Sequence, residues 1–410
     1  MNSKIIIFTE KITNRINYIF DFILRDYSGI EFEITTDINE FLNSTSPKIN
    51  FSNQFLNNQL NYKVDEVLLE TDIRENMNYD SLNEIGKCFY WLSRYEEYIA
   101  KPDQLDVHNR FIGSDLDYSQ PIVDQICLKI QDELKKHYPT IVFKKRVFKQ
   151  INSYDVDYAW KYLHHSTKIK YGSLAKKLLK GDFKNLKEQI DVLLKIKNDP
   201  YDTFEYLKTQ DQNHKIESIY FWLLVDYSKC DKNHNWKNRK QQDLIHHISE
   251  YATIGIHPSY QSNQKNDLIK EEILRLKSIV HQEVTKSRQH FLKLEFPNTY
   301  QQLLINGIKE DYSMGFARQL GFRAGTSTPF KWFDLSTNQQ TLLITYPLVA
   351  MDVTLKNYLK LTPEQAIEEL SKIKKTIKSV NGTFITLFHQ SNLNGDWFVW
   401  RKVYESIFHD

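Results

Sequence analysis

The feature that most constrains the fold is a change of pattern at residue 146, after which strand-length apolar runs alternate with amphipathic helices. The predicted strands are 147–154, 218–225, 252–256, 284–288, 308–313, 319–323, 341–346 and 383–388. Helices with one apolar face are predicted between several of them, including 266–282 and 363–380. Such alternation over residues 146–410 predicts an α/β fold, either a distorted (β/α) barrel or an open doubly wound sheet. No glycine-rich phosphate loop follows any of these strands, which argues against nucleotide binding.

Residues 1–145 are predicted to form a small α/β domain in front of the barrel domain at 146–410. Its strands are predicted at 5–8 and 32–34, and its helices at 11–26, 85–99 and 121–136. Residues 43–61, rich in Asn, Ser and Gln, are predicted to be a loop or a disordered segment, and 137–139 is the predicted linker. The polar string at 93–98 is interpreted as a solvated helix face with Arg–Glu pairs, with a binding surface as the alternative. No motif in this domain indicates its role.

Composition excludes several classes of protein. The 410-residue chain carries 54 basic and 52 acidic residues, a net charge of +2, which gives no reason to expect nucleic acid as a partner. Its cysteines, Cys88, Cys127 and Cys230, fit neither a disulfide framework nor a zinc cluster, and we expect reduced thiols in a cytosolic protein. The longest apolar run, 219–225, has the length of a strand, and the run at 5–8 is too short for a signal peptide. We therefore expect a cytoplasmic protein without a membrane span, and nothing in the sequence indicates its oligomeric state.

Two aspartates stand where the first strand of the barrel domain ends. The β-type run at 147–154 stops at Asp155 and Asp157, and parallel α/β folds collect their chemistry at the carboxyl ends of strands. The i, i+2 spacing turns both side chains to the same side if the strand continues through them. Two carboxylates so close together repel each other unless a cation lies between them or one of them binds a proton. A pair exposed to water or capping the next turn is the alternative.

Further polar residues end the later predicted strands: Asp226, His257, Arg288 with His290, Asp311, Arg323, Asp352 and His389. Each has an ordinary structural explanation by itself, such as a hydrogen-bonded loop histidine at His257 or a buried ion pair at Arg323. A barrel, however, places the carboxyl ends of all its strands on one face, so that these residues converge. Carboxylates and imidazoles together favour metal-assisted hydrolysis, in which a metal activates water, a base takes its proton and an acid protonates the leaving group.

The order of these motifs resembles that of the polysaccharide deacetylase (carbohydrate esterase) superfamily. The resemblance rests on Ser153-Tyr154-Asp155-Val156-Asp157, His257-Pro258-Ser259, Arg288 and Leu387-Phe388-His389. The chain is more closely similar to a divergent bacterial group of such proteins that carry an uncharacterised N-terminal domain. That similarity rests on the stretches 91–98, 255–260, 287–292, 311–315 and 321–326. The resemblance implies a distorted (β/α) barrel and metal-dependent removal of acetyl groups from acetylated sugars.

The resemblance also implies roles for individual residues. Asp155 matches the general base, Arg288 the arginine that orients this base, and His389 the general acid. Asp157 and His257 match metal ligands, and the implied cofactor is a divalent metal, for which we expect zinc. The superfamily places a second metal histidine four residues after the first, where this chain has Gln261, whose amide is a poor zinc ligand. His290 is the substitute that we predict.

Three hypotheses of function follow. The first is a metal-dependent deacetylase-like hydrolase that acts on an N-acetylated sugar or glycan precursor, so that its partner is a carbohydrate substrate. The second is a catalytically inactive deacetylase-like protein that binds a carbohydrate or a protein partner, because Gln261 replaces a metal ligand. The third is a metal-free structural subunit. Metal content separates the first hypothesis from the other two.

Overall fold

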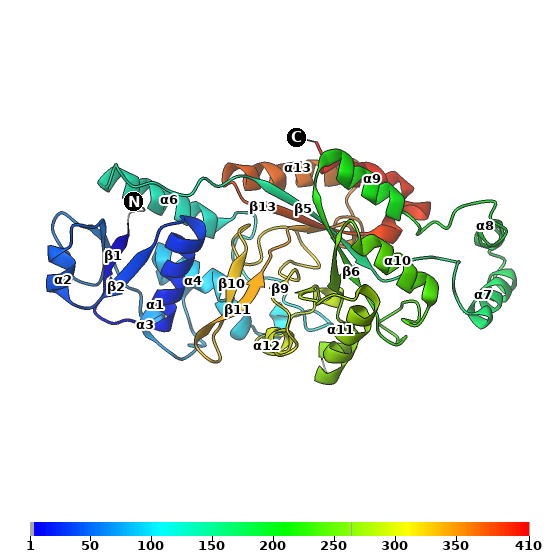
Figure 1. Ribbon diagram of the computed structural model, residues 1–410, viewed down its shortest axis with the longest axis horizontal. Helices are drawn as coiled ribbons and strands as arrows, with labels where there is room; N and C mark the ends of the chain where they lie inside the picture. Colours follow the sequence, from blue (N-terminus) through cyan, green and yellow to red (C-terminus); the bar gives the residue numbers. More distant parts are fainter. Residues whose placement is uncertain (1–3, 264, 410) are drawn as a thin grey trace.

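A computed structural model describes residues 4–263 and 265–409. The molecule is elongated (Figure 1), with a small sheet near the N-terminus at one end, a large sheet in the middle, and the helices α7 (Thr167–Leu179) and α8 (Phe183–Leu193) at the other end. No helix among the described residues is long and apolar enough to cross a membrane.

The first sheet is parallel throughout, with the strand order β2-β1-β3-β4 within the described part of the chain. Its strands are β1 (Ile5–Phe8), β2 (Phe32–Thr35), β3 (Lys48–Phe51) and β4 (Leu60–Tyr62). The prediction of a loop at 43–61 is therefore wrong, since β3 and the start of β4 lie in it. Their Asn and Lys residues have low intrinsic preference for strands, and pairing with β1 organises these short segments instead.

The helices predicted in this region are present, with interruptions. Its helical segments are α1 (Asn14–Phe20), the π-helical η1 (Asp21–Tyr27), α2 (Ile38–Asn43), α3 (Glu66–Leu69), η2 (Tyr79–Ser81), α4 (Glu84–Leu92), α5 (Tyr95–Tyr98), η3 (Pro102–Gln104) and α6 (Ile122–His137). The predicted helix 85–99 breaks at Arg94, whose backbone is left-handed with φ of 55°. The break turns Arg94 inward, and its side chain is fully buried.

The second sheet runs in the order β10-β11-β9-β8-β7-β6-β5-β13-β12 within the described residues, and each neighbouring pair is parallel except β10–β11. Its strands are β5 (Lys149–Val156), β6 (Glu217–Trp222), β7 (Thr253–Ile256), β8 (Lys286–Ser287), β9 (Glu310–Asp311), β10 (Phe330–Asp334), β11 (Gln339–Thr345), β12 (Ala350–Met351) and β13 (Thr383–His389). Helices follow most of the parallel strands, so the chain forms a distorted (β/α) barrel preceded by a small α/β unit.

The barrel helices are α9 (Phe204–His214), α10 (Arg239–Ser249), α11 (Asn266–Val280), α12 (Asn298–Ile305), α13 (Pro363–Ser379) and α14 (Arg401–Ser406), with short turns η4 (Tyr260–Asn263), η5 (His290–Leu292), η6 (Thr354–Tyr358), η7 (Gln390–Leu393) and η8 (Gly395–Trp400). Both helices predicted in the barrel domain, 266–282 and 363–380, are present, as α11 and α13. Helix α13 starts with a capping box between Thr362 and Gln365. The strand predicted at 319–323 is wrong, because these residues form turns, and Gly321 has φ of 115° where the carbonyl of Tyr118 approaches closely.

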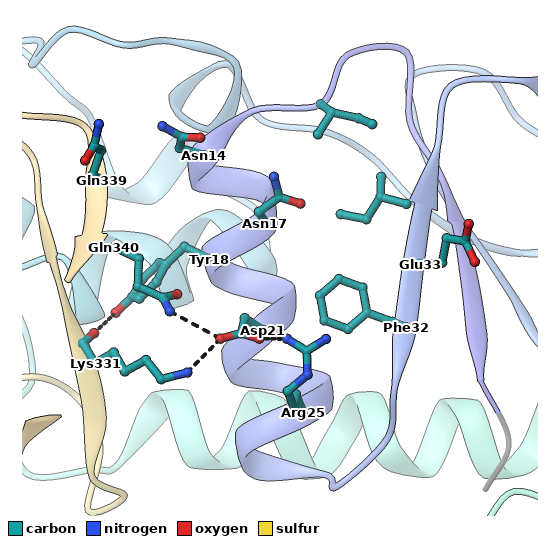
Figure 2. Close-up of a pocket in the computed structure, with 12 residues that line it drawn as sticks. Asn14, Asn17, Tyr18, Asp21, Arg25, Phe32, Glu33, Lys331, Gln339 and Gln340 are labelled. Atoms are coloured by element: carbon teal, nitrogen blue, oxygen red, sulfur yellow. Dashed lines mark hydrogen bonds and ion pairs between the residues drawn. The ribbon is translucent and has the colours of Figure 1, made fainter. Parts of the chain in front are cut away.

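Many contacts join the N-terminal unit to the barrel, and two of them involve ion pairs of Lys331 and Arg323. Figure 2 shows the first, where Lys331 of β10 pairs with Asp21 at 3.0 Å and Tyr18 donates to the Lys331 carbonyl at 2.8 Å. The second is a buried network in which Glu97 accepts from Arg94 and from Arg323. The interpretation of 93–98 as a solvated face is therefore wrong, because these Arg–Glu pairs are buried between the two units. The boundary between domains at 145 and 146 remains a prediction.

Candidate functional site

The sequence-predicted site residues lie in one pocket at the carboxyl ends of the central barrel strands. Strands β5 and β13 are paired so that Asp155 stands opposite His389, and the period of two turns both side chains to the barrel interior with Ile151 and Ile385. The pocket has a volume of about 210 Å³. It is lined by Arg110, Asp155, Asp157, His257, His290, Phe291, Leu292, Met351, Val353, Tyr358, Leu387 and His389. Arg288 lies directly behind Asp155 and is fully buried.

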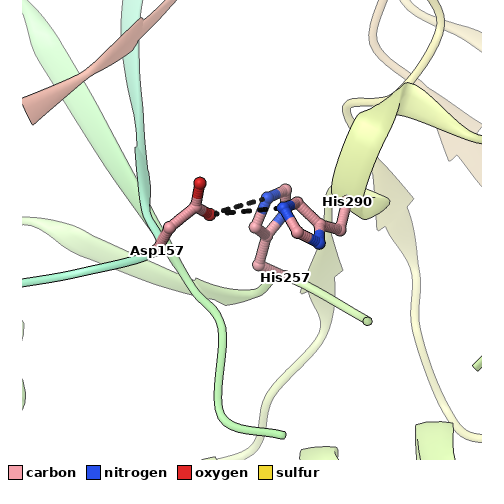
Figure 3. Close-up of side chains that lie close together, drawn as sticks. All are labelled: Asp157, His257 and His290. Atoms are coloured by element: carbon pink, nitrogen blue, oxygen red, sulfur yellow. Dashed lines mark ion pairs between the residues drawn. The ribbon is translucent and has the colours of Figure 1, made fainter. Parts of the chain in front are cut away.

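Asp157, His257 and His290 present three ligand atoms to one point (Figure 3). The Asp157 Oδ1 atom is 3.6 Å from His257 Nε2 and 3.7 Å from His290 Nε2, and all three ligand atoms lie within 4.8 Å of one another. Ligands about 2.0–2.2 Å from a tetrahedral zinc ion are about 3.4 Å apart, close to these separations. Asp157 Oδ1 is buried and has no hydrogen-bond partner among the described residues, so it is an acceptor without a donor. This donor set fits a divalent cation.

Both imidazoles are held in the orientation that a metal ligand requires. His257 is 1% exposed, and its Nδ1 lies 2.5 Å from the carbonyl oxygen of Arg288, to which it donates. His290 Nδ1 lies 2.9 Å from the Oδ1 of the buried Asp231, which also accepts from the Tyr260 amide at 2.7 Å. Metal-ligating histidines commonly use one nitrogen in this way, which fixes the ring and directs the other nitrogen to the ion.

The electrostatics of the pocket favour a positive charge between these residues. Burial disfavours the charged form of Asp157, but the adjacent imidazoles, His290 foremost, lower its pKa below the ordinary value. Burial also opposes the charge of His290, but Asp157 and Asp231 outweigh this effect and raise its pKa to about 10. Burial lowers the pKa of His257. A cation bound between Asp157 and His290 would take the place of the proton on His290, so its binding releases protons.

Asp155 occupies a different position beside the ligand set. Its Oδ1 accepts from Arg288 Nη1 at 3.0 Å, and its Oδ2 lies 3.6 Å from His257 Nε2. Arg288 is anchored in turn, because it donates to Ser153 Oγ at 2.7 Å and to the Tyr312 carbonyl at 3.0 Å. The contact expected between Asp155 and Arg288 is therefore present, and it leaves the second oxygen of Asp155 facing the pocket.

His389 closes the pocket from the end of β13 and is held by Asp352. Its Nδ1 lies 2.9 Å from Asp352 Oδ1, and its backbone amide donates to Asp352 Oδ2 at 2.9 Å. Burial alone would lower the pKa of His389, but the Asp352 carboxylate raises it to about 9. An imidazole with a raised pKa carries a proton near neutral pH and can donate it.

Two residues of the site, Asp231 and Arg110, were not predicted from the sequence. Asp231, which holds His290, lies in the loop after β6. In this loop the sequence predicted Asp226 as a strand-end residue instead. Asp226 is 77% exposed and pairs with Arg275, away from the pocket. Asp231 carries no motif that would distinguish it from other loop acids.

The second such residue, Arg110, comes from the N-terminal unit. Its guanidinium is held by Asp106 at 2.6 and 2.8 Å and donates through Nη1 to the Phe291 carbonyl at 3.0 Å. Phe291 and Leu292, directly after His290, are both left-handed, with φ of 64° and 53°. Such a backbone is strained for residues with side chains and persists only where its surroundings fix it. Arg110 is one of the groups that fix it.

Other strand-end residues do not join the pocket. Asp311 is fully buried and accepts from Ser287 and Ser313, and Arg323 belongs to the pair with Glu97. Gln261 and Asn263 do not line the pocket either. The Asn263 side chain accepts from Thr299 at 2.9 Å. Among the described residues, therefore, the imidazole beside Asp157 and His257 belongs to His290.

Comparisons with known proteins give distant matches. Residues 5–139 match the model of a family of unknown function (DUF7033). A search of curated proteins gives no match. Among solved structures, the chain is similar to a Mycobacterium smegmatis protein assigned as a polysaccharide deacetylase (TM-score 0.42, 12% identity, covering 65% of this chain and 85% of that one). It is also similar to a polysaccharide deacetylase from Bacillus cereus, with a TM-score of 0.29 and 10% identity, covering 63% of this chain and 85% of that one. A third similar structure is a 4-alpha-glucanotransferase from Thermococcus litoralis, with a TM-score of 0.35 and 9% identity, covering 65% of this chain and 37% of that one. Likenesses this distant carry no functional argument, so function has to be argued from the pocket.

Proposed function

We propose that the protein is a metal-dependent hydrolase that removes the acetyl group from an N-acetylated sugar or glycan precursor. The observation that carries the proposal is the convergence of three ligand atoms, from Asp157, His257 and His290. Beside them lie the Asp155 carboxylate, which Arg288 holds, and the His389 imidazole, which Asp352 holds. The choice of an acetylated sugar rests on the motif resemblance of the sequence.

The residues divide the chemistry between them. Asp157, His257 and His290 would hold a divalent cation, for which their ligand types favour zinc. When bound, such a cation supplies Lewis acidity. Asp155, whose Oδ2 faces the pocket, takes the proton of the attacking water while Arg288 holds its other oxygen in place. His389 donates a proton to the amine nitrogen as the carbon–nitrogen bond breaks, and acetate and the free amine leave.

The apolar part of the pocket suits a small acyl group. Met351, Leu387 and Leu292 line the pocket next to the polar residues, and all three are nearly fully buried. A methyl group placed among them loses its contact with water, which favours binding by about 0.8 kcal/mol for a group of this size. A pocket of about 210 Å³ is large enough for an acetyl group and part of a sugar ring.

Acetate release tests the proposal. The full chain is stripped with a chelator, reloaded with zinc, and assayed over a panel of N-acetylated sugars. We expect near-stoichiometric zinc and zinc-dependent release of acetate. The variant Asp157→Ala should lose the metal, while His247→Ala, at an imidazole that is 50% exposed and outside the pocket, should match the wild type. Sugar binding without bound metal or turnover would favour the inactive binding protein instead.

A further inference from the structure

The helices α7 and α8 form a hairpin that projects from the barrel at the end opposite the N-terminal unit (Figure 1). Helix α7 is 13 residues long, yet none of its residues is buried. Only Gln189 and Val192 are buried in α8. A short helix in water depends on packing of an apolar face for most of its stability. Much of the apolar surface of this hairpin is therefore not covered by another element of the described residues.

The exposed apolar side chains gather at the tip of the hairpin. Leu178 is 58% exposed, Leu179 87% and Phe183 66%, and they flank the tight turn at Gly181, which has φ of 66°. Ile169 and Tyr171, near the start of α7, are also exposed, at 54% and 68%. A group of exposed apolar side chains such as that at the tip marks a site of interaction rather than ordinary surface variation.

The hairpin is also strongly basic. Residues 167–197 contain nine lysines and three acidic residues, a net charge of +6. The whole chain has a net charge of +2, so the remaining residues together carry −4. Lys176, Lys180, Lys184 and Lys187 are all exposed around the tip. Positive charge is thus concentrated where the apolar side chains are.

We propose that the α7–α8 hairpin docks the protein on the surface of a bilayer that contains anionic lipids. Leucine and phenylalanine at the tip would enter the boundary between headgroups and acyl chains, and the surrounding lysines would contact the anionic headgroups. An acidic polymer would satisfy the lysines but would leave Leu179 and Phe183 in water. A neutral apolar partner would cover the leucines but would not use the charge. An anionic bilayer surface accounts for both observations.

The hairpin is joined to the barrel next to one of the pocket residues in the sequence. Helix α7 begins ten residues after Asp157, beyond the carboxyl end of β5. The proposal does not require the protein to be a hydrolase, and binding is measured without turnover.

Vesicle sedimentation with the full chain tests the proposal. The probes are vesicles of phosphatidylcholine alone and vesicles with equal parts of phosphatidylcholine and phosphatidylglycerol. We expect binding to the anionic vesicles, weak binding to the neutral ones, and weakening by high salt. Replacing Lys176, Lys180, Lys184 and Lys187 by glutamine should reduce affinity on the order of 10²–10³-fold, since each lysine contributes about fivefold. The variant L179S/F183S should lose on the order of tenfold or more per side chain.

Matched controls use residues equally exposed elsewhere. Lys101, Lys145, Lys309 and Lys375 are exposed lysines outside the hairpin, and Ile305 and Leu342 are 74% and 84% exposed. Glutamine at these four lysines, and I305S/L342S, should bind vesicles like the wild type. Equal binding to both vesicle types, or undiminished binding by L179S/F183S, would overturn the proposal. Concentration-dependent self-association that the tip variants abolish, without vesicle binding, would identify a second copy of the chain as the occupant and would also overturn it.

Discussion

Replacing Asp231 by asparagine tests whether His290 is positioned as a metal ligand. Asp231 is fully buried, and its Oδ1 accepts from His290 at 2.9 Å and from the Tyr260 amide at 2.7 Å. Asparagine has the same shape and keeps an acceptor oxygen, but it removes the negative charge behind the imidazole. Loss of such a supporting carboxylate typically lowers metal affinity about 10–100-fold. We therefore expect D231N to bind zinc weaker by about 1.4–2.7 kcal/mol.

The fold should tolerate the change. A hydrogen bond to a charged acceptor contributes about 1.5–3 kcal/mol and one between neutral groups about 0.5–1.5 kcal/mol, so the metal-free variant should lose on the order of 1–2 kcal/mol of stability. Zinc affinity is measured by competition with a chelator at neutral pH, and stability by urea unfolding of the metal-free protein. The control is Asp226→Asn, in the same loop, 77% exposed and paired with Arg275. This control should leave zinc affinity unchanged.

Unchanged zinc affinity of D231N would refute the role of Asp231 in positioning His290. If D231N binds zinc as tightly as the wild type while D157A does not bind it, the carboxylate behind His290 has no part in the site. His290 would then be a buried histidine that pairs with Asp231 for structural reasons. A D231N protein that fails to fold would be replaced by His290→Gln, in which the loss of zinc without loss of the fold tests the same ligand directly.

Four further predictions concern the pocket and the junction. In the metal-free protein, the free energy of unfolding should fall as pH rises from about 6.5 to about 10, because folded His389, with a pKa of about 9, and folded His290, with a pKa of about 10, keep protons that the unfolded chain has lost. Urea titrations should show a shallower decline in D352N, which removes the carboxylate that raises the pKa of His389, and an equal decline would contradict the assignment. H389A should keep its zinc and its fold but release acetate on the order of 10²–10⁴-fold more slowly. R110K should lower kcat/KM about 10–100-fold with zinc content unchanged. E97Q should destabilise the protein by about 3–5 kcal/mol in urea unfolding, because it leaves the buried Arg323 without its carboxylate.

The polar strand ends could be found from sequence because two simple rules apply to them. Parallel strands end on one side of a sheet, and side chains two residues apart in a strand point the same way. Asp155 and His389, at the ends of neighbouring strands β5 and β13, follow from these rules and from the apolar runs that precede them. Their spatial proximity required no knowledge of the loops.

The loops themselves did not follow from local patterns. Asp231 and Arg110 reach the pocket only because long segments fold back over the strand ends, and neither segment has a regular period. The buried pairs of Glu97 show the same limit, since charged residues at helical spacing look solvated unless the partner, Arg323, is known to lie against them. Strands β3 and β4 were missed because sheet pairing, rather than the preference of their residues, gives them their conformation.

His290 illustrates how a candidate metal site can be complete in space although its sequence lacks one residue of the motif that it resembles. Strands β7 and β8 are neighbours, with Ile256 paired to Ser287, so the loops that follow them begin side by side. An imidazole from either loop can reach the point beside His257, and the rings of His257 and His290 lie 5.0 Å apart between centroids. The residue four positions after His257, Gln261, instead lies in the turn η4, outside the pocket lining. A metal ion requires a donor atom at a given position, and a residue after either β7 or β8 can place a donor atom there. A missing histidine in one motif is therefore weak evidence against a metal site when the next strand ends in another.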